Sequence, residues 1–112
     1  MSEYPPNIRV DTLIKYLSYL IKYDTWDKLL KLKNDVSPAT ALKVISYAKK
    51  LGILYEKMIR SEKKRPVKVF VIVDGEYPIK LKNFEGTLYS YKKGNKVVIG
   101  VYTEVDLKEG SI

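Results

Sequence analysis

Basic side chains are concentrated in one third of this 112-residue chain. From Ser37 to Ile72 there are nine lysines and arginines against two acids, which accounts for +7 of the net charge of +8. A concentrated positive field attracts polyanions such as DNA, because each neutralised phosphate releases a condensed counterion. We therefore expect this stretch to bind phosphate groups; the alternative is a solubilising surface. The nine residues are Lys43, Lys49, Lys50, Lys57, Arg60, Lys63, Lys64, Arg65 and Lys68.

Catalytic chemistry has few candidates. The chain has no cysteine and no histidine, which removes disulfides, thiol nucleophiles, histidine-based triads and most transition-metal sites. No glycine loop of the phosphate-binding kind is present. The remaining carboxylate pairs are typical of turns and helix starts, so we expect no enzyme activity, no cofactor and no metal. These pairs are Asp74 with Glu76, Glu104 with Asp106, and Asp24 with Asp27.

The composition is that of one soluble domain. Hydrophobic residues make up 46% of the chain and charged residues 30%, and no apolar run is long enough to span a bilayer. The start of the chain lacks the features of a secretion signal, so we expect a cytoplasmic protein that does not bind membranes. The absence of cysteine and glutamine together with many lysines is typical of hyperthermophiles, which favours an archaeal host, virus or plasmid.

Three helices are predicted in the first half of the chain. The first should start near Asn7 or Asp11, either of which is suited to cap it, and a short second helix should follow the break at Asp24-Thr25, which supplies its cap. The third should be capped by Ser37, carry Pro38 in its first turn and end at Gly52. Apolar spacing predicts that the first two helices bury Leu13, Leu17, Leu20, Trp26, Leu29 and Leu30.

The third helix has two distinct sides in the predicted pattern. At 100° per residue, Ala41, Leu42, Ile45 and Ala48 fall within one arc, which we expect to be buried. Four residues should project from the opposite side: Thr40, Lys43, Tyr47 and Lys50.

Strands are predicted in the rest of the chain. Residues 53–60 and 67–73 should form a hairpin with residues 61–66 at its tip. Asp74-Gly75 is a turn signal, and strand-like runs follow at about 77–82, 87–91 and 96–104. Pro78 has no N–H to donate, so its run should be either an edge strand or irregular.

The stretch from Val36 to Leu54 resembles the corresponding part of winged helix-turn-helix domains. It has a turn hydrophobe, the cap Ser37, small and aliphatic core positions, and then Leu51-Gly52-Ile53-Leu54 leading into a strand. The resemblance implies an α+β fold with three helices and a β-hairpin wing. It also implies three parts: a flexible arm at 1–10, the winged helix at 11–73, and a β-rich extension at 74–112 packed on or extending the same domain.

The resemblance implies binding to double-stranded DNA, as in a transcriptional regulator. The third helix would enter the major groove and the wing would contact the backbone or minor groove. The outward face of the helix has no arginine, asparagine or glutamine, so we expect phosphate or shape recognition more than base readout. The expected contacts are Ser37, Thr40, Lys43, Tyr47, Lys50, Arg60, Lys63, Lys64, Arg65 and Lys68.

Several alternatives remain at this stage. Tyr47 could instead pack over Leu51 or on the C-terminal third. A homodimer is an expected partner, because winged-helix regulators often read two half-sites and helix 1 has a tyrosine face at Tyr16, Tyr19 and Tyr23. The domain could instead be an adaptor that binds a protein in a replication, transcription or viral complex, with the C-terminal strands as one docking surface. Single-strand binding is a third alternative, with bases stacked on Tyr89 and Tyr91.

Overall fold

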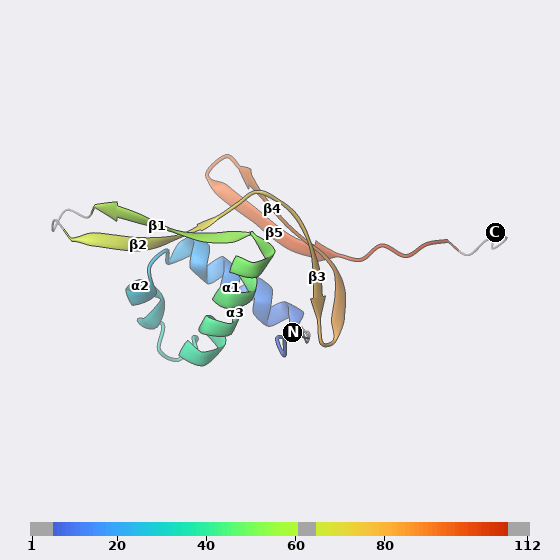
Figure 1. The fold of residues 1–112 in the computed structure, drawn as a ribbon, viewed down its shortest axis with the longest axis horizontal. Coiled ribbons are helices and arrows are strands. Elements are labelled where there is room, and N and C mark those ends of the chain that lie inside the picture. Colours follow the sequence, from blue (N-terminus) through green and yellow to red (C-terminus); the bar gives the residue numbers. More distant parts are fainter. Residues whose placement is uncertain (1–5, 61–64, 108–112) are drawn as a thin grey trace.

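The computed structural model describes residues 6–60 and 65–107. Within them, three helices are followed by a two-stranded and then a three-stranded antiparallel sheet, so the fold is α+β (Figure 1). The hairpin β1–β2 extends away from the helices at one end of the molecule, and the segment after β5 extends at the other (Figure 1). The elements are α1 (Val10–Lys22), α2 (Trp26–Leu30), α3 (Pro38–Leu51), β1 (Leu54–Arg60), β2 (Pro66–Ile72), β3 (Gly75–Leu81), β4 (Phe84–Lys93) and β5 (Lys96–Tyr102).

Helix α1 begins without the side-chain cap predicted for it. Arg9 occupies the cap position, and no side chain accepts a hydrogen bond there, so the expectation of a cap at Asn7 or Asp11 was wrong. Asp11 lies in the first turn instead, where its Oδ1 accepts a hydrogen bond from the backbone N of Thr12 at 3.0 Å. A negative charge in the first turn still stabilises the positive end of the helix dipole.

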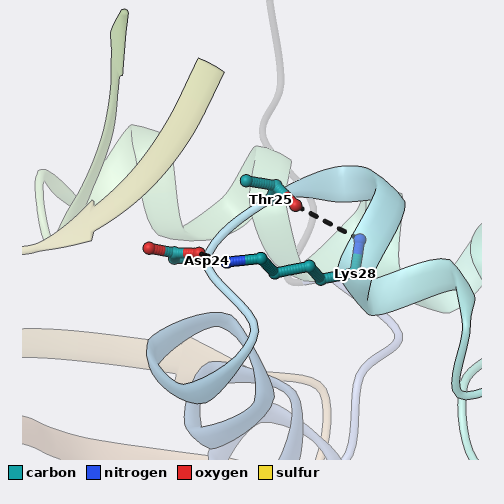
Figure 2. A network of polar contacts seen from close by, with 3 residues as sticks. All are labelled: Asp24, Thr25 and Lys28. Carbon is teal, nitrogen blue, oxygen red and sulfur yellow. Dashed lines mark hydrogen bonds and ion pairs between the residues drawn. The ribbon is translucent and has the colours of Figure 1, made fainter. Parts of the chain in front are cut away.

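Helix α2 begins at the predicted cap. The Thr25 hydroxyl accepts a hydrogen bond from the backbone N of Lys28 at 3.2 Å (Figure 2). The Lys28 ammonium reaches back to Asp24, with Nζ and Oδ1 3.1 Å apart (Figure 2). The backbone O of Asp24 also accepts a hydrogen bond from the backbone N of Phe70 at 2.8 Å, which joins the α1–α2 connection to strand β2.

Helix α3 has the predicted signals at both ends. The Ser37 hydroxyl accepts a hydrogen bond from the backbone N of Thr40 at 3.4 Å, and Pro38 is the first helical residue. Gly52 ends the helix in the left-handed conformation, with φ of 88°. Its backbone N donates to the carbonyl of Ala48 at 3.1 Å, which is how the chain leaves the helix and turns into β1.

Replacing Gly52 by alanine is expected to lower the free energy of unfolding by about 1 kcal/mol. A Cβ at this position would meet no atom within 4 Å, so the cost is backbone strain alone. Chemical denaturation of both proteins measures it. Gly94 also has a positive φ, of 61°, in the β4–β5 turn, and provides a matched position in a hairpin. An unchanged stability for Gly52→Ala would contradict the left-handed end of α3.

The strands form two separate sheets, a division that was not predicted from the sequence. Strand β1 pairs with β2, and β3, β4 and β5 form a second sheet in that order, so the run of Pro78 is an edge strand, one of its two predicted alternatives. Asp74-Gly75 is not a hairpin turn, because β2 and β3 belong to different sheets. The hydroxyl of Tyr77 donates to the carbonyl of Val73 at 2.8 Å and holds this connection.

One hydrophobic core joins all of these elements. Leu13, Leu17, Leu20 and Leu29 are almost fully buried, as predicted, whereas Trp26 and Leu30 are only half-buried. The same core includes Phe70 of the hairpin and three residues of the second sheet, so residues 74–102 pack on the helices. These three are Ile79, Leu81 and Leu88.

The segment just before α1 packs against the core. Ile8 is buried in the core, so the predicted arm at 1–10 is attached to the domain from that residue.

Tyr16 of α1 is buried, whereas Tyr19 of the same helix and Tyr23, which directly follows it, are half-buried. The ring centroids of Tyr16 and Tyr19 are 5.8 Å apart, and those of Tyr19 and Tyr23 are 6.4 Å apart. No helix among the described residues has the length and apolar character needed to cross a membrane.

Candidate nucleic-acid interface

The start of helix α3 is fixed against α1. The backbone N of Ser37 donates to the hydroxyl of Tyr16 at 2.9 Å, while the Ser37 side chain caps the helix. Because Tyr16 is itself buried, this hydrogen bond holds the first turn of α3 in place. Ser37 is exposed but has this structural role, and Thr40, which is half-buried, lies one turn further along.

The buried face of α3 differs from the predicted one by a rotation. Leu42, expected in the core, has 57% of its surface exposed, and Val44 is fully buried in its place. At 100° per residue, Val44 lies nearer than Leu42 to the centre of the arc formed by Ala41, Ile45 and Ala48. The apolar stripe that a surface helix turns toward the core is only about as wide as the arc covered by Val44, Ala48, Ala41 and Ile45, so Leu42 falls outside it.

Lys43 and Lys50 lie on the exposed face of α3, as predicted. Among the residues that the structure describes, neither forms an ion pair. Lys49, one position from Lys50, is different: its ammonium pairs with the carboxylate of Glu56 on β1. Within 6–60 and 65–107, these two lysine charges of the helix therefore face solvent without a counterion.

Tyr47 lies on the side of α3 that packs against strand β3. Its hydroxyl donates to the backbone O of Lys80 at 3.3 Å and accepts from the backbone N of Lys80 at 3.1 Å. Of the three roles considered for this residue, the structure shows packing on the C-terminal third. A contact with a phosphate or base was another of the three, and both hydrogen-bonding directions of the hydroxyl are already used here.

Replacing Tyr47 by phenylalanine is expected to destabilise the protein by about 1 kcal/mol while leaving DNA affinity unchanged. The ring keeps its packing, but the two backbone groups of Lys80 lose their partner. Denaturant unfolding and a duplex-binding assay on the same preparation separate the two effects. A loss of DNA affinity without a loss of stability would assign Tyr47 to the interface after all.

The hairpin β1–β2 carries the rest of the predicted contacts. Glu56 pairs with Lys49 and also with Lys68, whose ammonium lies 3.5 Å from the second carboxylate oxygen. Lys68 is therefore partly neutralised. Arg60 ends β1 opposite Pro66, and Arg65 precedes β2, both exposed. Lys63 and Lys64 lie outside the described residues.

The predicted residues thus fall into two groups. Lys43 and Lys50 belong to the helix, whereas Arg60 and Arg65 belong to the far end of the hairpin, which extends away from the helices (Figure 1). Lys57, omitted from the predicted contacts, is exposed in the middle of β1, on the opposite face of the strand from Arg60. Its place among the nine basic residues was the signal that could have included it.

The hairpin and α3 also expose apolar side chains. Met58 and Ile59 of β1 are 56% and 42% exposed, in addition to Leu42 on the helix. Such residues are not required for phosphate binding. Met58 shares its face of β1 with Arg60, and Ile59 shares the opposite face with Lys57, so each face of the hairpin carries both an apolar side chain and a cation.

No family model, curated protein or solved structure matches the chain. A positively charged helix face and a projecting hairpin can bind a polyanion by point contacts with its phosphates. Among the described residues, no group of three or more acidic side chains could hold a metal ion.

Proposed function

We propose that this chain is a winged helix-turn-helix domain that binds double-stranded DNA as a transcriptional regulator. The order of three helices followed by a hairpin supports this, as does the hydrogen bond between Phe70 and Asp24, which ties the base of the hairpin to the helices. In this proposal α3 enters the major groove and the hairpin β1–β2 contacts the flanking backbone or minor groove.

The observation that carries the proposal is the unneutralised charge on α3. Lys43 and Lys50 are exposed and have no ion-pair partner among the described residues. In the described strands of the hairpin, Glu56 is the one acid, and it is already paired with two lysines. Nearby acids therefore do not cancel the field that a phosphate would meet.

The proposed mode of recognition follows from the side chains available. Lysine is a flexible point charge that suits phosphates, and no arginine, asparagine or glutamine on the exposed side of α3 offers a bidentate contact to a base. Affinity should therefore depend strongly on salt and weakly on base sequence. Arg65 and the neighbouring Lys63 and Lys64 would supply the minor-groove or backbone contacts of the wing.

The experiment compares a duplex with each of its separated strands in a salt titration of the intact protein. We expect tighter binding to the duplex and a linear fall of log K with log salt, with a slope of about −0.9 for each neutralised phosphate. Equal affinity for duplex and single strands would contradict entry of a helix into the major groove.

A second candidate function is the binding of a protein partner. It is favoured by three exposed apolar side chains: Leu42 on α3, and Met58 and Ile59 on the two opposite faces of β1. An acidic partner with apolar side chains would complement them. The two functions differ in one variant: Leu42→Ala should leave duplex affinity nearly unchanged, whereas it should weaken a protein complex that depends on this face.

A further inference from the structure

The face of the second sheet that points away from the helices carries a row of tyrosines. Tyr89 and Tyr91 lie on one side of β4 with ring centroids 6.2 Å apart and planes 23° from parallel. Tyr102 of β5 continues the row, 6.2 Å from Tyr89. None of the three belongs to the core, and Tyr91 and Tyr102 are 47% and 36% exposed. We call these three residues the tyrosine platform.

The platform is built into the strand register. Tyr89 is paired across the sheet with Gly100 of β5, and its ring lies over that glycine. A Cβ at Gly100 would stand only 2.5 Å from the Tyr89 hydroxyl oxygen and 2.8 Å from the ring carbon that bears it. Glycine is therefore needed at position 100 for the Tyr89 ring to lie on β5. The opposite face of the ring then points outward.

Two carboxylates stand beside the rings. Glu76 of β3 is paired with Tyr89 in the register and accepts a hydrogen bond from the Tyr102 hydroxyl. Asp74 is held by the backbone N of Lys92, which donates to its Oδ2 at 3.2 Å. The hydrogen bond to Glu76, followed by burial, raises the pKa of Tyr102 above its ordinary value.

The rings and the carboxylates surround a hollow of about 410 Å³. It is lined by Asp74, Gly75, Glu76, Tyr89, Ser90, Tyr91 and Tyr102. The faces of aromatic rings carry negative electrostatic potential and attract cations within about 6 Å of the ring centre. Two acids at the edge of the hollow add attraction of the same sign and oppose a phosphate group.

From this arrangement we infer that the hollow beside the tyrosine platform binds an organic cation, an alkylammonium or a guanidinium group. The rings would contact its apolar surface, and Glu76 and Asp74 would offset its charge. The site lies on β3, β4 and β5, away from Lys43 and Lys50, and it does not depend on DNA binding. Lys93, which follows Tyr91 on the same face of β4, limits the site on that side.

The test uses choline and its uncharged tert-butyl analogue, which have nearly the same shape. Proton NMR of the ligands reports contact with the rings, because aromatic ring currents shift nearby methyl signals upfield. We expect a saturable shift for choline and an affinity about two- to fivefold weaker for the uncharged analogue, as cation–π attraction at exposed sites predicts. Equal binding of the two ligands would overturn the inference.

Two variants locate the site. Tyr91→Leu removes one ring and Glu76→Gln removes one charge, and each should weaken choline binding by about two- to fivefold. Tyr55→Leu is the matched control, because Tyr55 of β1 is 48% exposed and lies outside the hollow. Unchanged choline binding in both site variants, with circular dichroism showing that they are folded, would also overturn the inference.

Further ligands distinguish the source of the cation. A short peptide with one trimethylated lysine or one arginine should bind more tightly than choline if the natural ligand is a side chain of a partner protein, and no more tightly if it is a small molecule. Both outcomes support a cation site. A single-stranded oligonucleotide that perturbs the tyrosine signals when choline and the peptides do not would overturn it in favour of base stacking.

Discussion

Replacing Lys43 and Lys50 together by alanine is expected to lower duplex affinity at least tenfold at about 0.1 M salt and to flatten the salt slope by nearly two units. Both lysines are exposed on α3 and are free of ion pairs among the described residues, so each is able to neutralise one phosphate. Alanine is the best helix former and should preserve α3. Fluorescence anisotropy with a labelled duplex, repeated across salt concentrations, gives both quantities.

The matched control removes the same charge elsewhere. Lys93 and Lys96 are exposed at the β4–β5 turn, and their replacement by alanine changes the net charge of the protein by the same amount. If binding depends on α3, this control should lose little affinity. An equal loss in both double variants would show that DNA responds to net charge alone, and the proposed interface would then be wrong.

Replacing Leu88 by alanine is expected to lower the free energy of unfolding of the whole domain by about 2–5 kcal/mol. Leu88 of β4 is fully buried and belongs to the same core as the leucines of α1. Truncation loses the transfer energy of the removed atoms and leaves a cavity between the sheet and the helices. Denaturant unfolding should be followed by the helical circular dichroism signal, which reports on α1 and α3 rather than on the sheet.

Leu107→Ala provides the comparison for Leu88→Ala. Leu107 lies beyond β5 and is 92% exposed, so the same truncation should change stability by less than about 0.5 kcal/mol. If Leu88→Ala leaves the helical transition in place, the C-terminal sheet unfolds separately from the helices. In that case residues 74–102 would be an independent unit and not part of one cooperative domain.

Three local signals were predicted correctly: the caps of α2 and α3 and the end of α3. Thr25 and Ser37 cap their helices, and Gly52 ends α3, because each acts through a hydrogen bond or a backbone angle that depends only on its neighbours. The edge position of Pro78 follows from its missing N–H for the same reason.

Predictions that depended on distant parts of the chain were less accurate. Leu42 and Val44 are separated by small rotations of α3, and which of them is buried depends on how α1 and the sheet pack around the helix. Asp74-Gly75 has the residues of a tight turn, but strand pairing placed it between two sheets. The cap of α1 was also misplaced, although it is a local feature.

Within the candidate site, the positively charged residues could be predicted from the sequence, but which of them are held in ion pairs could not. The sequence places Lys49, Lys50 and Lys68 in one basic stretch, yet only the fold brings Glu56 beside Lys49 and Lys68 and leaves Lys50 without an ion pair in the described part of the chain. Tyr47 is a similar case, because its hydroxyl is bound by the backbone of a strand 33 residues away.

In the proposed interface, α3 and the hairpin β1–β2 form one surface for duplex DNA. A titration of isotope-labelled protein with a short duplex, followed by amide NMR shifts, examines this surface residue by residue. We expect shifts on the exposed side of α3 around Lys43 and Lys50 and along the hairpin around Lys57 and Arg60, with little change on the outer face of β3–β5. Shifts centred on Tyr89 and Tyr91, or no shifts at low salt, would contradict the proposed interface.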